Sequence, residues 1–307
     1  MAHLSVVIPV YKAEKCLEEL YLRLTTSLEK ITKDYEIVLV EDRGGDRSWE
    51  MITQLASKDG RIKAIQFSRN FGQHFAITAG VDHCNGDWVV VMDCDLQDRP
   101  EEIIRLYAKA QEGHDIVLAR RVRRRHGLFK RMASWFFYKV FNYLSDMNYD
   151  GGVGNFSIAS RKVIDNFRQM REKLRLYGGL VKWMGFPAAT IDVDHDKTHL
   201  DGTTYTWGKL LSLAFNIIIA YSEKPLRLMI QFGFLMSFGS FVLGLYIIFR
   251  RFYYGISVAG WGSLIVSLYF IGGIIIGFLG LIGIYLGKTF DETKKRPLYI
   301  IQNTRNV

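Results

Sequence analysis

Three aspartates and a glutamine follow an apolar run in the first third of this 307-residue chain. Asp93, Asp95 and Asp98 come directly after Trp88–Met92, and Gln97 lies among them. The Val-rich run predicts a strand buried on both faces, because it is too short for a helix. Ligands of open α/β sheets bind beyond the carboxyl ends of the strands, so the cluster lies where a ligand is expected.

The spacing of the acidic residues favours a metal ion. Asp93 and Asp95 are two residues apart, so in a regular strand both would point toward one cation. Oxygen ligands favour Mg²⁺ or Mn²⁺ held jointly with substrate phosphates. An acidic loop that caps the next helix is the alternative, because Asp98, Pro100 and Glu101 also resemble a helix start.

Strands and helices are expected to alternate around this cluster. The sequence predicts strands at 4–10, 36–40, 62–67 and 88–92, and helices at about 13–31, 48–57 and 74–83. Such alternation is typical of a parallel, doubly wound sheet. The polar groups that end the strands would gather at one edge; these are Pro9 and Tyr11, Glu41 and Asp42, residues 68–73, and Asp93 to Asp98.

Two apolar segments near the C-terminal end contain no charged residue. They are residues 228–249 and 261–286, and each exceeds the roughly 20 residues that cross a bilayer. They predict two transmembrane helices, with a buried helical hairpin as the alternative. We expect a cytosolic domain at 1–225, a two-helix membrane domain at 226–287 and a cytosolic tail at 288–307.

Charge and the N-terminal residues predict the orientation. No basic stretch precedes an apolar run at the start, so we expect no signal peptide. Lys and Arg are more frequent before the first segment and after the second one than in the loop between them. This distribution predicts that both termini lie in the cytosol and that the protein is in the inner (plasma) membrane. The three cysteines fit a reducing compartment.

The net charge of +9 is concentrated in residues 119–131. Such a cluster could bind nucleic acid or anionic lipid, and the two apolar segments favour lipid, so no nucleic-acid partner is expected. Residues 128–147 carry apolar and aromatic side chains at helical spacing, typical of a helix in the membrane interface; a packed amphipathic helix is the alternative. If interfacial, this helix would bring cations and a hydroxyl to a lipid phosphate: Arg120, Lys130, Arg131 and Ser134.

Several stretches together resemble a known enzyme family. SVVIPVYKAE (5–14), ED (41–42), SRNFGQHFAITAG (68–80) and VVVMDCDLQD (89–98) resemble the motifs of family-2 GT-A glycosyltransferases. Within that family they are most similar to the polyisoprenyl-phosphate glycosyltransferases, including bactoprenol glycosyltransferases and relatives of dolichyl-phosphate mannose synthase. The likeness continues to KKRPLYII (294–301), so it covers nearly the whole chain.

The resemblance implies a fold and roles for individual residues. The fold would be α/β, with a Rossmann-like, mostly parallel GT-A sheet followed by two transmembrane helices. Pro9, Tyr11 and Asp42 would bind the nucleotide, with Arg69 and Gln73 close by. Asp93, Asp95 and Gln97 would bind the metal, and Asp93 and Asp95 would take part in catalysis. Arg120, Lys130 and Ser134 would bind the acceptor phosphate. Gly152, Asn155 and Ser157 depart from the family, which usually has acidic residues, Phe and Arg in this segment.

The expected reaction is inverting transfer of one sugar from a nucleotide sugar, with UDP favoured, to undecaprenyl or another polyisoprenyl phosphate at the cytosolic face. A divalent cation would stabilise the departing diphosphate. An ionised phosphate acceptor needs no dedicated base. The rival hypothesis is a non-catalytic lipid-head-group binder or flippase accessory protein on a degenerate GT-A fold. Glycines in the second apolar segment also make a homo-oligomer plausible.

Overall fold

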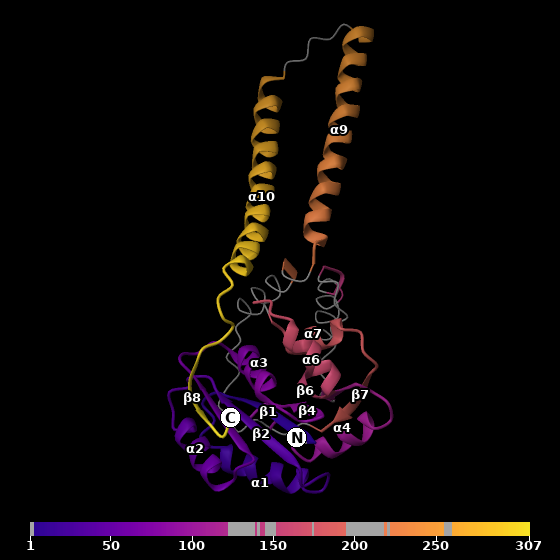
Figure 1. Cartoon of the computed structure of the whole chain (residues 1–307). Coiled ribbons are helices and arrows are strands. Elements are labelled where there is room, and N and C mark those ends of the chain that lie inside the picture. Colours follow the sequence, from indigo (N-terminus) through magenta and orange to yellow (C-terminus); the bar gives the residue numbers. More distant parts are fainter. Residues whose placement is uncertain are drawn as a thin grey trace. The chain divides into compact units, whose positions relative to one another are not determined.

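The computed structural model describes residues 3–121, 139, 142–144, 152–173, 175–194, 218–219, 222–254 and 260–307 (Figure 1). The chain forms two compact units. The first contains Met1–Tyr138, Asn148–Tyr205 and Arg296–Val307, and the second contains Lys139–Met147 and Thr206–Lys295. Each unit is described below by itself.

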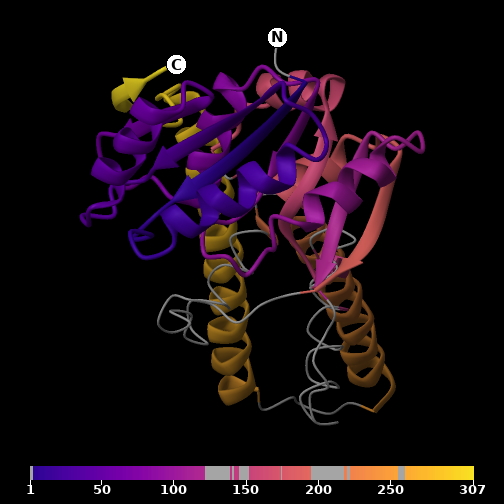
Figure 2. The same cartoon turned by 90° about the horizontal axis from the view of Figure 1, so that it is seen from below.

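The first unit is an α/β domain (Figures 1 and 2). Its strands are β1 (Leu4–Val10), β2 (Tyr35–Glu41), β3 (Ile62–Phe67), β4 (Trp88–Val91), β5 (Ile116–Arg121), β6 (Val153–Ser160), β7 (Ala188–Val193) and β8 (Ile301–Arg305). Its helices are α1 (Leu17–Leu28), α2 (Ser48–Lys58), α3 (Gln73–His83), α4 (Glu102–Ala110), α6 (Arg161–Gln169) and α7 (Tyr177–Trp183).

The strands form one eight-stranded sheet in the order β7-β5-β6-β4-β1-β2-β3-β8. Strands β1 to β4 are mutually parallel where they pair, as are β5 and β7, whereas β6 runs antiparallel to β4 and β5, and β8 runs antiparallel to β3. Every residue of β1 and β2 is buried, because helices cover both faces of the central strands. The predicted α/β fold with a mostly parallel sheet is therefore confirmed.

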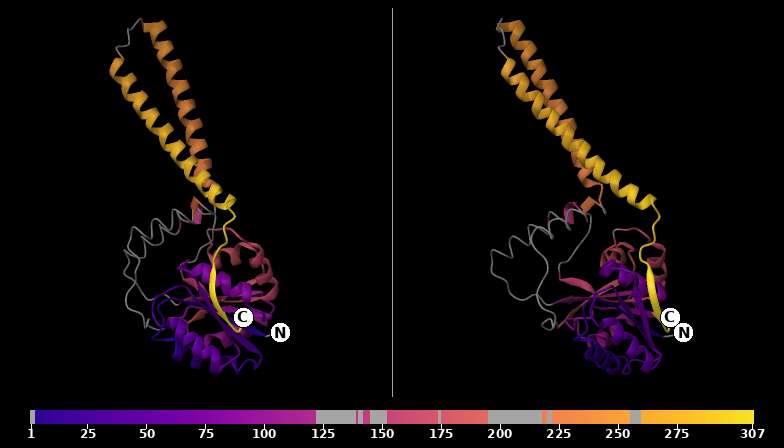
Figure 3. Two further views of the ribbon diagram at one scale, coloured as in Figure 1. Left: turned by 60° about the vertical axis from the view of Figure 1, so that its left-hand side comes forward. Right: turned by 90° about the vertical axis from the view of Figure 1, so that its left-hand side faces the viewer.

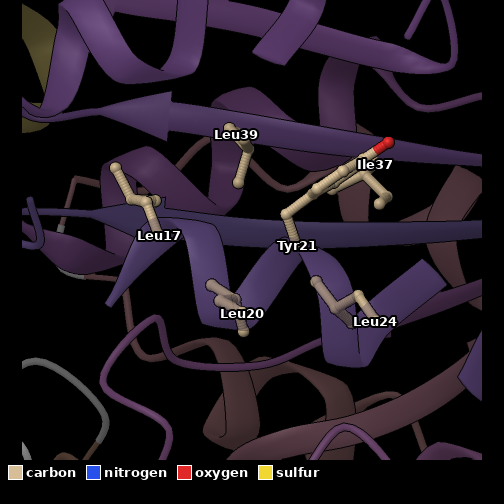
Figure 4. Close-up of a pocket in the computed structure, with 6 residues that line it drawn as sticks. All are labelled: Leu17, Leu20, Tyr21, Leu24, Ile37 and Leu39. Carbon is tan, nitrogen blue, oxygen red and sulfur yellow. The ribbon is translucent and has the colours of Figure 1, made fainter. Parts of the chain in front are cut away.

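Helix α1 covers one face of the sheet. Its apolar stripe of Leu17, Leu20 and Leu24 recurs at helical spacing and packs with Ile37 and Leu39 of β2 around a small apolar pocket (Figure 4). The pocket belongs to the core, since these five side chains are almost fully buried. This packing fixes β1 and β2, whose carboxyl ends carry the loops of the candidate site.

Most predicted elements are confirmed, with differences at their ends. Helix α1 spans Leu17–Leu28 rather than 13–31, because residues 11–16 form the loop that follows β1. Strand β4 ends at Val91, before the acidic residues. The premise that strand geometry points Asp93 and Asp95 the same way is therefore wrong.

The C-terminal strand β8 was not among the predicted strands. Ile301–Arg305 pairs antiparallel with β3 and lies at one edge of the sheet, drawn in yellow in Figure 3. Four of its five residues are exposed and polar, so its sequence carries little strand signal. The segment predicted as a tail thus contributes a strand to the α/β domain.

The second unit contains two long apolar helices, α9 (Lys224–Tyr254) and α10 (Trp261–Thr293). Within Lys224–Arg250 and Ser267–Thr293, an apolar stretch of 18 residues has a mean hydropathy of 2.0 and 2.2, respectively, and no part of either stretch is buried. Phe232 and Phe278 contact each other edge to face between the helices. Exposed side chains that are apolar on every side are unfavourable in water, so both helices are candidate membrane spans by length and composition.

Helix α3 packs closely on the opposite sheet face, and this contact requires a glycine. A Cβ atom at Gly80 would lie 2.2 Å from Cγ1 of Val7 and 3.4 Å from Cγ2 of Val40. We expect Gly80→Ala to lower the melting temperature of the protein in detergent, because overpacking costs about 1–3 kcal/mol and the higher helix propensity of Ala returns at most about 1 kcal/mol. Gly60→Ala is the control, since a Cβ there meets no atom within 4 Å; equal melting temperatures for both variants would contradict the packing argument.

Candidate functional site

The loops after β2 and β3 are joined by one buried aspartate. The carboxylate of Asp42 accepts the backbone N–H groups of Phe71 at 2.7 Å and Gly72 at 2.8 Å. The side-chain amide of Asn70 donates to the carbonyl of Asp42 at 2.9 Å. Burial raises the pKa of Asp42, although the two N–H groups oppose this shift. Asp42 therefore fixes residues 70–72 beside the end of β2.

The loops after β1 and β2 also meet. A Cβ atom at Gly44 would lie 2.7 Å from the backbone nitrogen of Lys12, so only glycine permits this approach. The backbone N–H of Ala13 donates to Oγ of Ser48 at 3.1 Å. Tyr11, at the end of β1, is 46% exposed at this edge. The loops that follow β1, β2 and β3 thus contact one another at one edge of the sheet, where the polar residues were expected to gather.

The remaining predicted nucleotide-binding residues lie on these same elements. Pro9 is in β1 and pairs in register with Val40 of β2. The guanidinium of Arg69 lies over the ring of Phe71, 4.7 Å from its centroid. Gln73 begins α3, and its side-chain amide donates to Oδ1 of Asp93 at 2.6 Å. Gln73 therefore connects the loop after β3 with the acidic cluster after β4.

Asp93 is at the centre of the acidic cluster. Besides Gln73, the side chain of Asn155 forms a hydrogen bond with it. Desolvation by burial, together with the Asp98 and Asp95 carboxylates, raises the pKa of Asp93 to about 7. Part of this carboxyl population is therefore protonated near neutral pH, and a cation at this position would favour the charged form.

The contact of Asn155 with Asp93 follows from strand pairing. Strand β6 lies between β4 and β5, and Val91 pairs in register with Ser157. The pairing ends there, and Asp93 and Asn155 each lie two residues beyond this last pair, so β6 carries Asn155 to the loop that holds Asp93. The sequence marked Asn155 as a departure from the family, but the pairing that brings it to the cluster was not predicted.

Arg121 is the cation beside the acidic cluster. Its Nη2 lies 3.3 Å from Oδ1 of the buried Asp98 and 4.0 Å from Oδ2 of Asp93. Arg120 and Arg121 are neighbours in β5, so their side chains point to opposite faces. The sequence predicted a role for Arg120 but none for Arg121 at the acidic cluster. Alternation of side chains along β5 could have indicated that only one of the two neighbours faces this cluster.

Arg120 is instead paired across β5 and β7. Its Nε donates to Oδ1 of Asp192 at 2.6 Å, and the two residues are register partners. Both side chains are about half exposed, so this ion pair contributes little to stability. Lys130, Arg131 and Ser134, the other predicted acceptor-phosphate residues, lie outside the described residues.

The turn after Asp93 positions the second aspartate of the motif. Oδ1 of Asp95 accepts the backbone N–H of Gln97 at 3.1 Å, and Leu96 between them has φ of +61° with a buried side chain. A non-glycine residue in this region of φ is uncommon, and the buried Leu96 anchors it. Tight turn geometry, not strand alternation, therefore places Asp95 and Gln97.

The donor set fits an ion that is shared with a phosphate ligand. Among the described residues, no group of three or more His, Cys, Asp or Glu side chains could hold a metal by itself. Mg²⁺ in phosphate-transfer sites is typically bound by one or two carboxylates, with substrate phosphates and water completing the shell. Asp93, Asp95 and Gln97 offer two carboxylates and an amide oxygen, which is enough for that kind of site.

Comparison with known proteins identifies the family. The sequence profile described as Glycosyl transferase family 2 matches residues 5–168, which is more than half of the chain. The chain belongs to glycosyl transferase family 2. The matched region contains all of β1 except Leu4, the whole of β2 to β6, and the site residues from Pro9 to Asn155. The predicted resemblance and the prediction of a glycosyltransferase are therefore confirmed.

Relatives in the family match over almost the whole chain. The uncharacterized glycosyltransferase YkcC of Bacillus subtilis (strain 168) is 36% identical over 304 residues, 99% of this chain and 94% of the relative. The prophage bactoprenol glucosyl transferase homolog of Escherichia coli (strain K12) is 34% identical, over 98% of this chain and 99% of that protein. The undecaprenyl-phosphate 4-deoxy-4-formamido-L-arabinose transferase of Salmonella choleraesuis (strain SC-B67) is also 34% identical, over 97% and 92%.

Among solved structures, glucosyl-3-phosphoglycerate synthase from Mycobacterium tuberculosis, crystallised with Mn²⁺, UDP and phosphoglyceric acid, is 16% identical to this chain. The comparison gives a TM-score of 0.49 and covers 71% of this chain and 76% of that one.

Proposed function

We propose that this family-2 glycosyltransferase transfers one sugar from a nucleotide sugar, with UDP as the favoured nucleotide, to polyisoprenyl phosphate at the cytosolic face of a membrane. One observation carries the proposal: Gln73 follows the loop that Asp42 holds and donates to Asp93, so the residues proposed to bind the nucleotide and those proposed to bind the metal lie side by side. The names of the bactoprenol and undecaprenyl-phosphate relatives support a polyisoprenyl phosphate acceptor.

The donor would lie along the strand ends. Pro9, Tyr11 and Asp42 would contact the base and ribose, with Arg69 and Gln73 close by. Asp93, Asp95 and Gln97 would hold Mg²⁺ or Mn²⁺ against the diphosphate, and this ion would stabilise the charge that develops on the leaving group. Arg121 is 4.0 Å from Asp93 and adds a fixed positive charge to a site that otherwise gathers carboxylates.

The acceptor is proposed to react without a protein base. A polyisoprenyl phosphate is ionised at neutral pH, so one of its oxygens can attack the anomeric carbon while the bond to the diphosphate oxygen breaks on the opposite face, with inversion. Asn155 beside Asp93 is consistent with this, because an amide cannot accept the proton that a hydroxyl acceptor would release. Arg120, Lys130, Arg131 and Ser134 would bind the acceptor phosphate.

The chain connectivity supports the proposed topology. The α/β unit contains Asn148–Tyr205, which precedes α9, and Arg296–Val307, which follows α10 and contributes β8 beside β3. A chain that crosses a bilayer twice between these segments returns to the side from which it left. Both segments would therefore lie on one side, and we propose from the distribution of Lys and Arg that this side is the cytosol.

We expect affinity for the nucleotide sugar with Mn²⁺ to rise with pH. Because the pKa of Asp93 is raised to about 7, metal binding there must displace a proton from part of the population. About a tenth of the carboxyl groups are ionised one unit below that pKa, so binding should be about tenfold weaker at pH 6 than at pH 8. Calorimetric titrations with a UDP-sugar measure this; Asp93→Asn should remove the slope, and an equal slope in that variant would contradict the assignment to Asp93.

The proposed function is tested on the full chain purified in detergent. It is incubated with polyisoprenyl phosphate, Mn²⁺ or Mg²⁺ and a panel of radiolabelled nucleotide sugars, and the lipid extract is analysed for a lipid-linked monosaccharide. We expect one donor to give a product that acid hydrolysis cleaves. No lipid-linked sugar with any donor, together with binding of the lipid, would favour the rival hypothesis of a non-catalytic head-group binder.

A further inference from the structure

The C-terminal segment from Tyr299 to Asn303 contacts β3 directly and reaches the end of β2 through Gln66. We propose that Tyr299 and Asn303 are positioning residues that hold the loops 68–72 and 41–45 in the form that binds the nucleotide. This inference rests on the proposed function, because that function makes these loops the donor site. Two separate sets of contacts support it, one through aromatic rings and one through hydrogen bonds.

The aromatic contacts reach the loop after β3. The ring of Tyr299 stacks on Phe67 at 5.3 Å, and Phe67 contacts Phe71 edge to face at 5.5 Å. The backbone N–H of Ser68 donates to the carbonyl of Ile300 at 3.0 Å. Since the N–H of Phe71 is the group that Asp42 accepts, Tyr299 supports the same residues that Asp42 fixes.

Tyr299 is itself held in place. Its hydroxyl donates to Oδ2 of Asp82 at 2.7 Å, and Nη1 of Arg171 lies 2.9 Å from the same oxygen. Burial and the hydrogen bond to Asp82 raise the pKa of Tyr299, so the hydroxyl stays protonated and remains a donor. The ring is therefore fixed between α3 and β3 and is not a loosely packed surface group.

The hydrogen bonds reach the loop after β2. Nδ2 of Asn303 donates to Oε1 of Gln66 at 2.7 Å, and Nε2 of Gln66 donates to Oε2 of Glu41 at 3.1 Å. Oε1 of Glu41 accepts the backbone N–H of Gly44 at 2.7 Å. Gln66 and Glu41 are buried, so each needs these partners, and loss of the first donor weakens the rest of the series.

The proposed donor site therefore depends on residues from both the N-terminal and the C-terminal parts of the sequence. The nucleotide loops come from the first hundred residues, whereas their support comes from residues that follow α10. The register shift of β3 between Gln66 and Phe67 allows Asn303 to contact Gln66 while Tyr299 reaches Phe67. The proposed membrane helices would thus be followed directly by the segment that orders the donor loops.

The experiment compares Tyr299→Ala and Asn303→Ala with Gln302→Ala in the full chain in detergent. Gln302 is exposed on the same strand and is the matched control. We expect each of the first two variants to raise the donor KM about tenfold, the cost of one lost buried interaction, and to leave kcat and the acceptor KM within about twofold. Tyr299→Phe retains the stacking and should retain more of the donor affinity.

Hydrogen exchange gives a second readout that needs no substrate. We expect peptides covering 41–45 and 68–72 to exchange about tenfold faster in both variants and at the wild-type rate in Gln302→Ala. A donor KM within twofold of wild type, unchanged exchange, or a lower melting temperature with neither effect would overturn the proposal. If the wild-type protein makes no lipid-linked sugar, the proposed function fails, while hydrogen exchange still decides whether the strand orders these loops.

Discussion

We expect Asp95→Asn to reduce sugar transfer by at least about a thousandfold at saturating donor, acceptor and Mn²⁺. The substitution changes the shape of the side chain very little but removes the negative charge that would hold the metal at the diphosphate. The tight turn at Leu96 should survive, because the amide oxygen can still accept the N–H of Gln97. Product formation in single-turnover assays measures the loss in the chemical step.

A matched control separates loss of the ion from loss of structure. Asp165→Asn changes a half-exposed carboxylate on α6 that pairs with Arg168 and Arg161. We expect it to retain turnover within about twofold, since exposed ion pairs contribute at most about 1 kcal/mol. Both variants should fractionate with membranes like the wild type. Turnover of Asp95→Asn within tenfold of wild type would remove its metal role.

The central fold was predictable because its signals are local. β1 to β4 are short, largely buried apolar runs, and α1 and α2 carry apolar residues at helical spacing. β8 has no such signal: its residues are mostly exposed, and its contact between Asn303 and Gln66 joins residues 237 positions apart. Pairing of that kind depends on which sheet edge is open, and sequence periodicity does not contain this information.

The sequence predicted where the candidate site lies on the sheet, but not which of its side chains contact one another. The rule that polar strand ends gather at one edge located Asp42, Gln73 and Asp93 correctly. It could not show that Gln73 bonds to Asp93, nor that β6 enters the sheet between β4 and β5 and brings Asn155 to the cluster. These contacts follow from an antiparallel insertion, which strand-by-strand patterns do not indicate.

We expect Lys130→Ala combined with Arg131→Ala to lower kcat/KM for the lipid acceptor by about a hundredfold, while the donor Kd stays within about twofold. A charge-assisted hydrogen bond to a phosphate is worth about 1.5–3 kcal/mol, so two lost bonds allow at least this effect. Initial rates across a series of polyisoprenyl phosphate concentrations in detergent micelles, with the donor saturating, measure it. Donor affinity is measured by calorimetry without lipid.

The decisive comparison is with Arg123→Ala combined with Arg124→Ala. This pair lies in the same basic segment and removes the same charge, so attraction between a basic segment and anionic lipid should fall equally in both double variants. A specific acceptor-phosphate site requires the Lys130 and Arg131 variant to lose at least tenfold more. Because a general field weakens with salt whereas a directly bonded phosphate is screened less, the difference should persist at 0.5 M NaCl. If both double variants lose kcat/KM for the lipid acceptor equally, the basic segment acts only by attracting anionic lipid. Ser134 and Arg120 would then be the remaining candidates for binding the acceptor phosphate.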